Sequence, residues 1–549
     1  MILSFKNNSR FQLVILLILA VIFFFIYSYL IFSNDLNKFT WPDETANYFF
    51  ITNYINQSSF SAPETVNEIA GDLIHPRSFN VYDHNLVPGS FVGMLFVYGL
   101  VGKIVGPNLI FFLTPLLSVL AGLFFYKILA KIFPQKIAFL SAILFFINPA
   151  WWYYSSFSML PNIAFISFLI IGIYFLLKVD KKLWQRNVFY IVASSFFMGL
   201  ALIIRTNEFL WIIAVLLFLL IIYHKKIKWY YPVLYIIVLV LVFLPIFYLN
   251  QTTYGSALSF GYLRLEQGSG VIGQLPSEFK TSQHSEIYNF VKFLVLPFGL
   301  SIKNIIPVFN DYFISLFWWL FVPAVLGLFA LIKKYNNKEV AVYLLGFVGI
   351  SVYLLVYYGS WIFADQMTLQ LNKIGISYIR YFLPIYILAL PFIAIFYFSF
   401  ISLFSNKKFK IILSLFLLTS LLYFNINVVY LAGYDNLIKI NENIDDYNVI
   451  NQKITELTED NAIIISQRSD KIFFPQRKVI ATWSFEEITH WQGLLAAGYP
   501  LYYYAFEGDE YLYQFNFDLA DNYSLNLTNE TIIHNNERLF KIEFLADEN

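Results

Sequence analysis

The sequence contains no cysteine among its 549 residues, which excludes disulfide bonds and thiolate metal sites. Charged residues are also scarce: they make up 13% of the chain, whereas soluble domains average roughly 25%. No HExxH, P-loop, GxSxG or dinucleotide-binding fingerprint is present. The chain is instead 59% hydrophobic, and this composition indicates that most of it faces lipid or other apolar helices.

The few charges are divided unevenly along the chain. Residues 1–435 carry 28 Lys and Arg against 16 Asp and Glu, a balance of +12. Residues 436–549 carry 8 against 19, a balance of −11. The sequence therefore predicts a basic transmembrane domain over 1–435 and an acidic, water-exposed domain over 436–549.

Eleven segments have the composition and length of a membrane helix, which needs about 20 apolar residues. They are residues 11–32, 109–130, 137–154, 161–178, 188–204, 208–224, 230–249, 312–332, 339–358, 379–403 and 409–431. Lys6 and Arg10 place the N-terminus inside, because basic residues concentrate on the cytoplasmic side. With eleven spans, the later basic clusters at 127–136, 178–186, 225–228, 333–338 and 407–410 all fall inside too. We therefore expect an all-α polytopic protein of the cytoplasmic membrane, with about 11 transmembrane helices and its C-terminus outside.

Two long loops are expected on the outer side, at residues 33–108 and 250–311, and a shorter one at about 359–378. Within the first, residues 87–106 are apolar but contain five glycines and Lys103. Counting them as a span would move the basic clusters outside, so we interpret them as an interfacial helix.

The C-terminal domain is predicted to be a small α/β unit. Its expected helices are 440–458 and 485–497, its strands are 462–466 and 478–481, and residues 530–544 alternate like a hairpin.

Ionisable residues gather at the predicted outer boundary rather than inside the spans, which favours chemistry at the membrane surface over transport. Asp43 and Glu44 directly follow the first span, within the segment 40–48. Adjacent carboxylates suit a base and a neighbour that tunes it. A helix that starts at Pro42, with acids in its first turn, accounts for the same residues structurally.

Three arginines are candidate ligands for an anion: Arg380, Arg205 and Arg264. Arg380 starts a span on the outer side, where a guanidinium and a helix N-terminus suit a phosphate and Tyr381 suits the interface. Snorkelling or a salt bridge explains Arg380 equally well. Arg205 lies in a tight turn with Glu208, and the two could simply pair.

Asp83 and His84 precede the expected interfacial helix, where they could bind a metal or orient a base. No further ligand is spaced to complete such a site, so a structural use remains open. Residues 467–471 form a polar loop after the first C-terminal strand, which could bind a ligand or serve docking.

The order of these features resembles the GT-C glycosyltransferases, polytopic enzymes that take a sugar from a polyprenyl phosphate carrier. It is most similar to the branch of protein O-mannosyltransferases and lipid A aminoarabinose transferases, glycosyltransferase family 39. In that branch the first outer loop carries an acidic motif just after the first span, and Asp43-Glu44 occupies the corresponding position here. The same loop of the family also holds surface-lying helices, to which residues 87–106 correspond. Other similar segments are 148–149, 254–262, 380–384 and 470–475. The histidine and glycine context of the eukaryotic mannosyltransferases and their β-trefoil insertion are missing, which leaves the acceptor open.

The resemblance implies an inverting single displacement from a polyprenyl-phosphate sugar to a hydroxyl of a protein, lipid or glycan. Asp43 is then the base and Glu44 its neighbour, while Arg380, with Arg205 or Arg264, holds the donor phosphate. A divalent cation, Mg or Mn, is a candidate cofactor, and no nucleic acid partner is expected. A lipid-linked-glycan flippase or transporter, a glycan polymerase or ligase, and a non-catalytic subunit remain alternatives.

Overall fold

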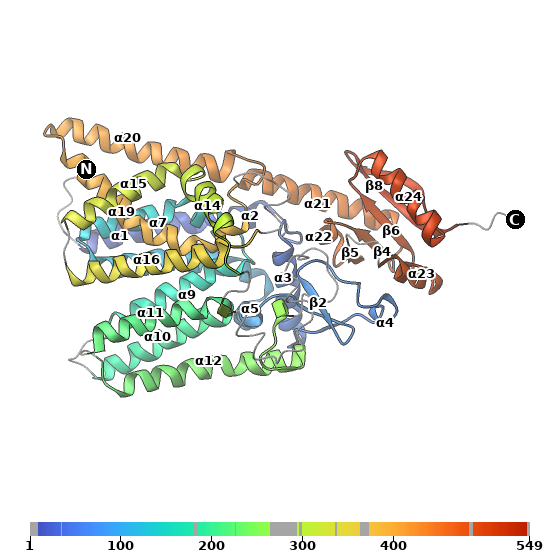
Figure 1. Cartoon of the computed structure of the whole chain (residues 1–549), viewed down its shortest axis with the longest axis horizontal. Coiled ribbons are helices and arrows are strands. Elements are labelled where there is room, and N and C mark those ends of the chain that lie inside the picture. The colour runs from blue at the N-terminus through green and yellow to red at the C-terminus, as the bar shows by residue number, and fades with distance from the viewer. Residues whose placement is uncertain are drawn as a thin grey trace. The chain divides into compact units, whose positions relative to one another are not determined.

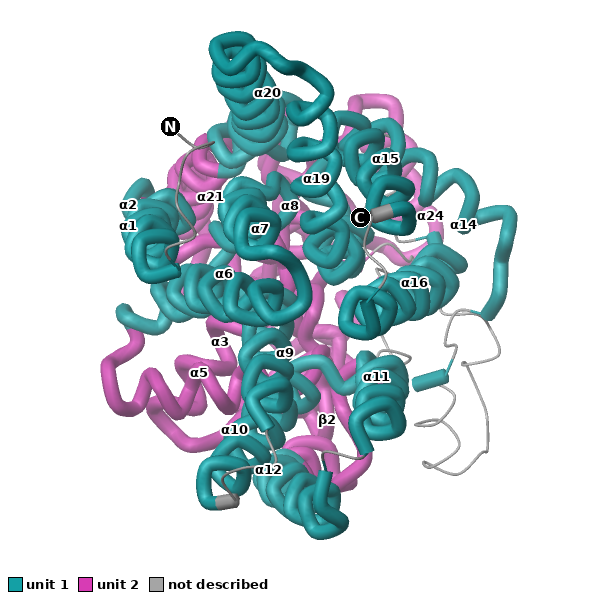
Figure 2. Tube along the Cα trace, turned by 90° about the vertical axis from the view of Figure 1, so that its left-hand side faces the viewer, with its two compact units in different colours: residues 1–33, 108–246, 288–440 teal, residues 34–107, 247–287, 441–549 magenta. Residues whose placement is uncertain are grey.

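The computed structural model describes residues 9–34, 36–179, 184–224, 227–263, 294–295, 299–334, 337–362, 373–482 and 487–545. The chain forms two compact units, each built from three stretches of sequence (Figure 2). Unit 1 contains 1–33, 108–246 and 288–440, and unit 2 contains 34–107, 247–287 and 441–549.

Unit 1 consists of apolar helices whose long members run side by side, seen lengthwise in Figure 1 and nearly end-on in Figure 2. Its described elements are α1 (Ser9–Tyr27), α2 (Tyr29–Ser33), α6 (Leu113–Ile132), α7 (Gln135–Ile147), α8 (Pro149–Ser155), α9 (Pro161–Leu176), α10 (Trp184–Ile204), η3 (Thr206–Glu208), α11 (Phe209–Tyr223), α14 (Ile302–Phe309), η7 (Asn310–Ser315), α15 (Trp318–Lys334), α16 (Lys338–Gly359), α18 (Ser377–Tyr381), α19 (Leu383–Ser402), α20 (Lys407–Ile426) and η8 (Asn427–Leu431). Three more elements, η2 (Pro107–Phe112), α12 (Tyr230–Tyr254) and α21 (Leu437–Leu457), have residues in both units.

Eight helices among the described residues are long and apolar enough to cross a membrane, and two bent pairs bring the number to ten if each pair is one span. One bent pair, α7 with α8, turns by 49° at Asn148, whose side chain accepts a hydrogen bond from Trp151 N at 3.0 Å and so caps α8. The predicted span 161–178 forms α9, a shorter apolar helix. The predicted polytopic helical architecture is confirmed, while the total of eleven spans and their orientation stay predictions.

The outward side chains of the unit 1 helices are strongly apolar. On α12, for example, Ile236 is 59% exposed and Leu241 57%, and on α20 Ile412 is 65% exposed. Large apolar side chains exposed to this extent are unfavourable in water and favourable in lipid.

The first part of unit 2 contains helices and a small antiparallel sheet. Its elements are α3 (Pro42–Gln57), β1 (Ala62–Pro63), α4 (Asn67–Ala70), β2 (Phe79–Tyr82), β3 (Asn85–Pro88), α5 (Val92–Val105) and η5 (Gly261–Leu263). The three strands pair in the order β1-β3-β2 within the described residues.

Helix α5 corresponds to the expected interfacial helix, and its 14 residues are too few to span a bilayer. It packs closely on α3 at Gly99, where an added Cβ would come 2.6 Å from the Tyr54 ring. Lys103 Nζ lies 4.1 Å from the same ring centroid and donates to Ser58 Oγ at 2.7 Å. Ile104 is 85% exposed, so the helix is buried on one side and apolar on the other.

The C-terminal part of unit 2 is a mixed sheet with helices, which confirms the predicted α/β unit. Its elements are β4 (Ile463–Ser466), α22 (Asp470–Phe473), β5 (Lys478–Ala481), α23 (Ile488–Ala496), β6 (Leu501–Ala505), α24 (Asp509–Tyr523), β7 (Leu525–His534) and β8 (Glu537–Phe544). In the described part of the chain the strand order is β5-β4-β6-β8-β7. Strand β4 is parallel to β5 and β6, and β8 is antiparallel to β6 and β7. The sequence analysis did not predict β6 or α24.

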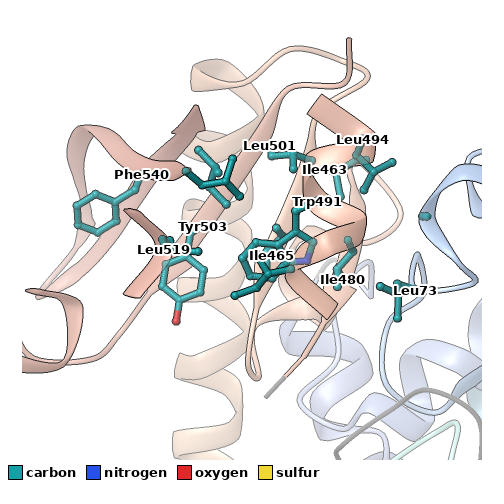
Figure 3. Packing of buried hydrophobic residues seen from close by; sticks show 14 of the residues in the cluster. Leu73, Ile463, Ile465, Ile480, Trp491, Leu494, Leu501, Tyr503, Leu519 and Phe540 are labelled. Carbon is teal, nitrogen blue, oxygen red and sulfur yellow. The ribbon is translucent and has the colours of Figure 1, made fainter. Parts of the chain in front are cut away.

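The first loop and the C-terminal segment share one hydrophobic core. Val66, Ala70, Leu73 and Ile74 belong to the same buried cluster as residues of β4, β5 and α23, and Figure 3 shows Leu73 beside this cluster. Polar contacts join the same segments: a parallel bridge links His75 to Ile480, and Lys478 Nζ lies 2.6 Å from Glu64 Oε2. Residues 34–107 therefore fold with the C-terminal segment in one unit, and the boundary predicted after residue 435 stays a prediction.

Candidate active site

The paired acids lie at the N-terminus of α3, as the helix-start interpretation expected. Pro42 is the first helical residue, where its missing N–H removes no helical bond. Asp43 and Glu44 occupy the first turn, where the helix dipole favours negative charge. Asp43 is half-buried and Glu44 is 4% exposed, so the two carboxylates have different environments.

One partner of Asp43 comes from the segment before β2. The Ser78 hydroxyl donates to Asp43 Oδ1 at 2.7 Å. Ser78 has a φ of +67°, a left-handed conformation that is uncommon for residues other than glycine. Its carbonyl accepts from Gly89 N at 3.0 Å, and an added Cβ at Gly89 would come 2.5 Å from that carbonyl oxygen.

The residue before Ser78 is anchored by the C-terminal segment. Asp470, whose side chain is fully buried, accepts from Arg77 Nε at 2.6 Å and from the Arg77 backbone N at 2.7 Å. Arg77 also donates to the Arg468 carbonyl. Lys471 donates to the carbonyl of Thr40, just before α3. The segment 470–475 was noted in the sequence as a family-like stretch, and its first two residues also belong to the polar loop 467–471. It contacts Thr40, just before the paired acids, and Arg77, next to the Ser78 that bonds Asp43.

Lys38 is a second link to this segment, and the sequence analysis did not single it out. Its ammonium donates to the Phe474 carbonyl at 3.1 Å and to Gln476 Oε1 at 2.6 Å. Burial lowers the pKa of Lys38 to about 7.

Four aromatic rings pack under α3 at the same place. The Phe474 ring centroid lies 5.0 Å from those of both Phe49 and Phe79. Phe79 in turn lies 4.8 Å from Phe50. The two contacts of Phe474 are edge-to-face, a geometry that adds stability beyond the area it buries, and they fix Phe79, the residue that follows Ser78.

Asp83 and His84 form the turn between β2 and β3. Their φ values are +50° and +61°, as a type I′ hairpin turn requires. Both are exposed, and His84 Nδ1 lies 2.8 Å from Asp72 Oδ1, a hydrogen bond that raises the pKa of His84. Within the described residues no group of three or more His, Asp or Glu side chains could hold a metal ion.

The residues at the start of the second predicted outer loop pack on this hairpin. Tyr254 donates to the Pro88 carbonyl at 2.9 Å, and Asn80 donates to the Gly261 carbonyl at 2.8 Å. An added Cβ at Gly261 would lie 2.2 Å from the Gly89 carbonyl carbon, so this position requires glycine. Arg264, the third predicted phosphate ligand, lies outside the described residues.

In unit 1, Arg205 forms a buried polar cluster with Glu208. Its NH2 lies 2.9 Å from Glu208 Oε1 and donates to Tyr358 OH at 2.8 Å. Glu208 also accepts from Trp211 Nε1 at 2.6 Å and from Tyr358 OH at 2.5 Å. The Tyr381 ring stacks on Tyr358 with centroids 4.4 Å apart. The local pairing that the sequence left open is therefore present.

Arg380 lies on α18 and is 8% exposed. Its guanidinium donates to Ser377 Oγ at 3.2 Å and lies 5.2 Å from the Tyr381 ring. The start of α18 is fixed by Asp435, whose carboxylate accepts from Gly375 N at 2.6 Å. Burial raises the pKa of Asp435. The sequence had marked Asp435 only as part of a domain boundary.

The chain is similar to one protein family over part of its sequence and to solved structures over nearly its whole length. A family model for dolichyl-phosphate-mannose-protein mannosyltransferases matches residues 91–248. No curated protein matches the sequence. The solved structure of ArnT from Cupriavidus metallidurans in the apo state is similar with a TM-score of 0.54, at 11% identity, over 97% of this chain and 98% of that one.

Two further structures extend this likeness. ArnT from the same organism bound to undecaprenyl phosphate has a TM-score of 0.53 at 10% identity, with 97% of this chain and 98% of that chain covered. The oligosaccharyltransferase from Archaeoglobus fulgidus in the apo form has a TM-score of 0.53 at 14% identity, with 91% and 70% covered. These matches confirm the GT-C resemblance and the predicted fold class: the chain is a multi-pass membrane protein with the fold of the GT-C glycosyltransferases.

Proposed function

We propose that the chain is a membrane glycosyltransferase that moves a sugar from a polyprenyl phosphate to an acceptor hydroxyl at the outer face of the cytoplasmic membrane. The observation that carries this proposal is the fold shared with ArnT over 97% of the chain, since ArnT has also been solved with undecaprenyl phosphate bound. The mannosyltransferase family model over residues 91–248 supports the same class of reaction. The side of the membrane follows from the basic clusters that the sequence places inside.

Asp43 is the proposed base. The acceptor oxygen attacks the anomeric carbon as the bond from that carbon to the phosphate oxygen breaks, and the polyprenyl phosphate leaves with the electron pair. Asp43 takes the proton of the attacking hydroxyl, and the sugar configuration inverts because a single displacement occurs. A half-buried carboxylate at a helix N-terminus, held by Ser78 and beside the buried Glu44, supports this assignment.

Arg380 is the proposed main contact for the donor phosphate, because a guanidinium stabilises the charge that develops on the leaving group. Arg205 and Arg264 are the further candidates. The Arg205 guanidinium already faces Glu208, so we expect it to contribute less than Arg380. Carboxylates such as Asp43 and Glu44 are the ligands that Mg²⁺ and Mn²⁺ prefer, and a divalent ion stays a candidate cofactor.

The test uses the purified full chain in lipid nanodiscs with undecaprenyl-phosphate mannose and a panel of other undecaprenyl-phosphate monosaccharides. Released undecaprenyl phosphate is measured by mass spectrometry. With an active donor, Asp43→Asn should lower kcat by about 100-fold or more, the usual contribution of a general base. Asp509→Asn, at an exposed carboxylate of the C-terminal segment, should not change it. Wild-type turnover by Asp43→Asn would overturn the assignment of the base.

A second candidate function is transfer of an oligosaccharide, as in a glycan ligase. The fold likeness to the Archaeoglobus fulgidus oligosaccharyltransferase over 91% of this chain favours it. A polyprenyl-diphosphate oligosaccharide in the same assay distinguishes the two candidate functions. The first expects the polyprenyl-monophosphate sugar to be consumed, and the second expects the diphosphate oligosaccharide to be consumed. Mass spectrometry of cell-envelope glycans with and without the gene then names the sugar and its acceptor.

A further inference from the structure

We propose that Asp470 and Arg77 are positioning residues that hold the Ser78 hydroxyl on Asp43, so that the C-terminal segment sets the geometry of the proposed base. This inference rests on the proposed function in one respect: it takes Asp43 as the base. Asp470, Arg77, Ser78 and Asp43, which we call the relay, all lie within unit 2. Each of its links is a contact of the described structure.

The first link fixes the backbone at Arg77. Asp470 accepts one bond from the Arg77 backbone N and one from its Nε, so a single carboxylate sets both the place and the direction of the chain. The Asp470 side chain is 0% exposed and that of Arg77 11%. Water therefore competes poorly for this pair, and its geometry is tightly held.

The second link is the conformation of Ser78. A non-glycine residue in the left-handed region persists where its surroundings over-determine it. Here Asp470 holds Arg77, the residue before Ser78. The Ser78 carbonyl accepts from Gly89 N, and Phe79, the residue after Ser78, packs on Phe474. Glycine would take this backbone without strain, so a serine points to a use for the hydroxyl.

The third link is the hydroxyl itself. Its 2.7 Å bond to Asp43 Oδ1 restrains rotation of the carboxylate. A base must lie within about 3 Å of the oxygen whose proton it accepts, and a displacement of 1 Å can cost about 100-fold in rate. Asp470 and Arg77 thus act on the reaction through Ser78, without touching the substrate.

The first experiment compares Ser78→Ala with Ser78→Gly in the nanodisc assay, using the undecaprenyl-phosphate monosaccharide that the wild-type chain consumes. Both remove the hydroxyl, but glycine also removes the backbone strain. We expect kcat to fall about 10- to 100-fold in both, with the donor KM changed less than about 2-fold. Ser59→Ala, whose hydroxyl donates locally to the Ser61 carbonyl, should keep wild-type kcat. Wild-type kcat in Ser78→Gly would overturn the proposal, because a role in backbone conformation alone predicts that result.

The second experiment tests the relay by a double-mutant cycle. Asp470→Asn keeps the size of the side chain but removes the charge that holds Arg77, and we expect kcat to fall about 10-fold without a matching rise in KM. If Asp470 acts through Ser78, the variant Asp470→Asn/Ser78→Ala should be no slower than Ser78→Ala alone. Fully additive losses would overturn the relay.

The two proposals fail separately. Wild-type turnover by Asp43→Asn would show that Asp43 is not the base, and it would overturn the proposed mechanism. Loss of turnover in Asp43→Asn together with wild-type kcat in both Ser78 variants leaves the mechanism in place and overturns the positioning role alone. Because the Ser78 variants remove a single hydroxyl from a half-buried site, they keep the test available even where Asp470→Asn folds poorly.

Discussion

Two buried arginine–carboxylate pairs, one in each unit, differ in how far apart their partners lie in the sequence. In unit 1, Arg205 pairs with Glu208 three residues later, at 2.9 Å. In unit 2, Arg77 pairs with Asp470, 393 residues away in sequence, at 2.6 Å. In both pairs the two side chains are at most 11% exposed.

The local pair forms inside one short turn, and Tyr358 of α16 adds hydrogen bonds to both partners. Glu208 satisfies Arg205, Tyr358 and Trp211 together, which suits a unit whose outer surface is apolar and where an unpaired charge would be costly. The distant pair instead holds two segments of the chain together. The Arg77–Asp470 interaction therefore contributes to the stability of unit 2 in the region around Asp43.

The largest expected effect comes from removing one partner of each pair. Asp470→Ala and Glu208→Ala should each lower the free energy of unfolding by about 3–5 kcal/mol, because the remaining guanidinium is buried without its counter-charge. The variants should differ in where the chain opens. Asp470→Ala should expose residues 34–107 to trypsin before global unfolding, whereas Glu208→Ala should leave them protected.

Thermal unfolding in detergent and timed proteolysis with mass spectrometry check this prediction. Asp446→Ala, at an exposed carboxylate in the middle of α21, is the control and should behave as wild type. The double variant Arg205→Met/Glu208→Met should regain most of the stability, since an apolar pair of similar volume often replaces a buried ion pair without loss. Equal protection of residues 34–107 in both single variants would contradict the distinction between the pairs.

The same contrast explains what the sequence could predict. Apolar length located the long helices, Pro42 located the start of α3 with its two acids, and the spacing of Arg205 and Glu208 suggested their pairing. These signals are local, because each depends on residues within one turn or one span. Strand β6 and helix α24 were missed, since a short tyrosine-rich strand and a weakly apolar helix have little periodic signal.

The contacts that hold Asp43 could not be predicted in this way. The segment 470–475 was noted in the sequence as a family-like stretch, and residues 467–471 as a polar loop that could bind a ligand or serve docking. No local pattern indicated that this part of the chain meets Arg77, because a long-range contact follows from the assembled fold. Ser78 carried no signal either. A serine in the amino-acid sequence does not indicate a positive φ or a hydrogen bond to a carboxylate 35 residues earlier.

The next effect concerns Lys38, a cation that contrasts with Arg77. The described residues give Lys38 two neutral acceptors, the Phe474 carbonyl and Gln476 Oε1, and burial lowers its pKa from 10.5 to about 7. Below pH 7 the lysine is protonated in both folded and unfolded chains. Between about pH 7 and 10.5 the unfolded chain binds the extra proton, so stability should rise with pH, by at most about 1.4 kcal/mol per unit.

Thermal unfolding of the full chain in detergent between pH 6.5 and 9.5 measures this dependence. Lys38→Met should flatten the rise, because the group that titrates is gone. Lys439→Met, at an exposed lysine at the start of α21, should keep it. Parallel curves for wild type and Lys38→Met would assign the pH dependence to another group.

The smallest effect is expected at the exposed pair of Asp72 and His84, which lies at the opposite extreme from the two buried pairs. Asp72→Asn should lower the pKa of His84 toward its ordinary value, because the hydrogen bond to the carboxylate is what raises it. NMR of isotopically labelled histidine measures that change. The unfolding midpoint and kcat should stay at wild-type values, since exposed ion pairs contribute little and the turn geometry of Asp83 and His84 already explains these residues. A fall in kcat in His84→Gln with an unchanged midpoint would instead favour the chemical role that the sequence left open for this turn.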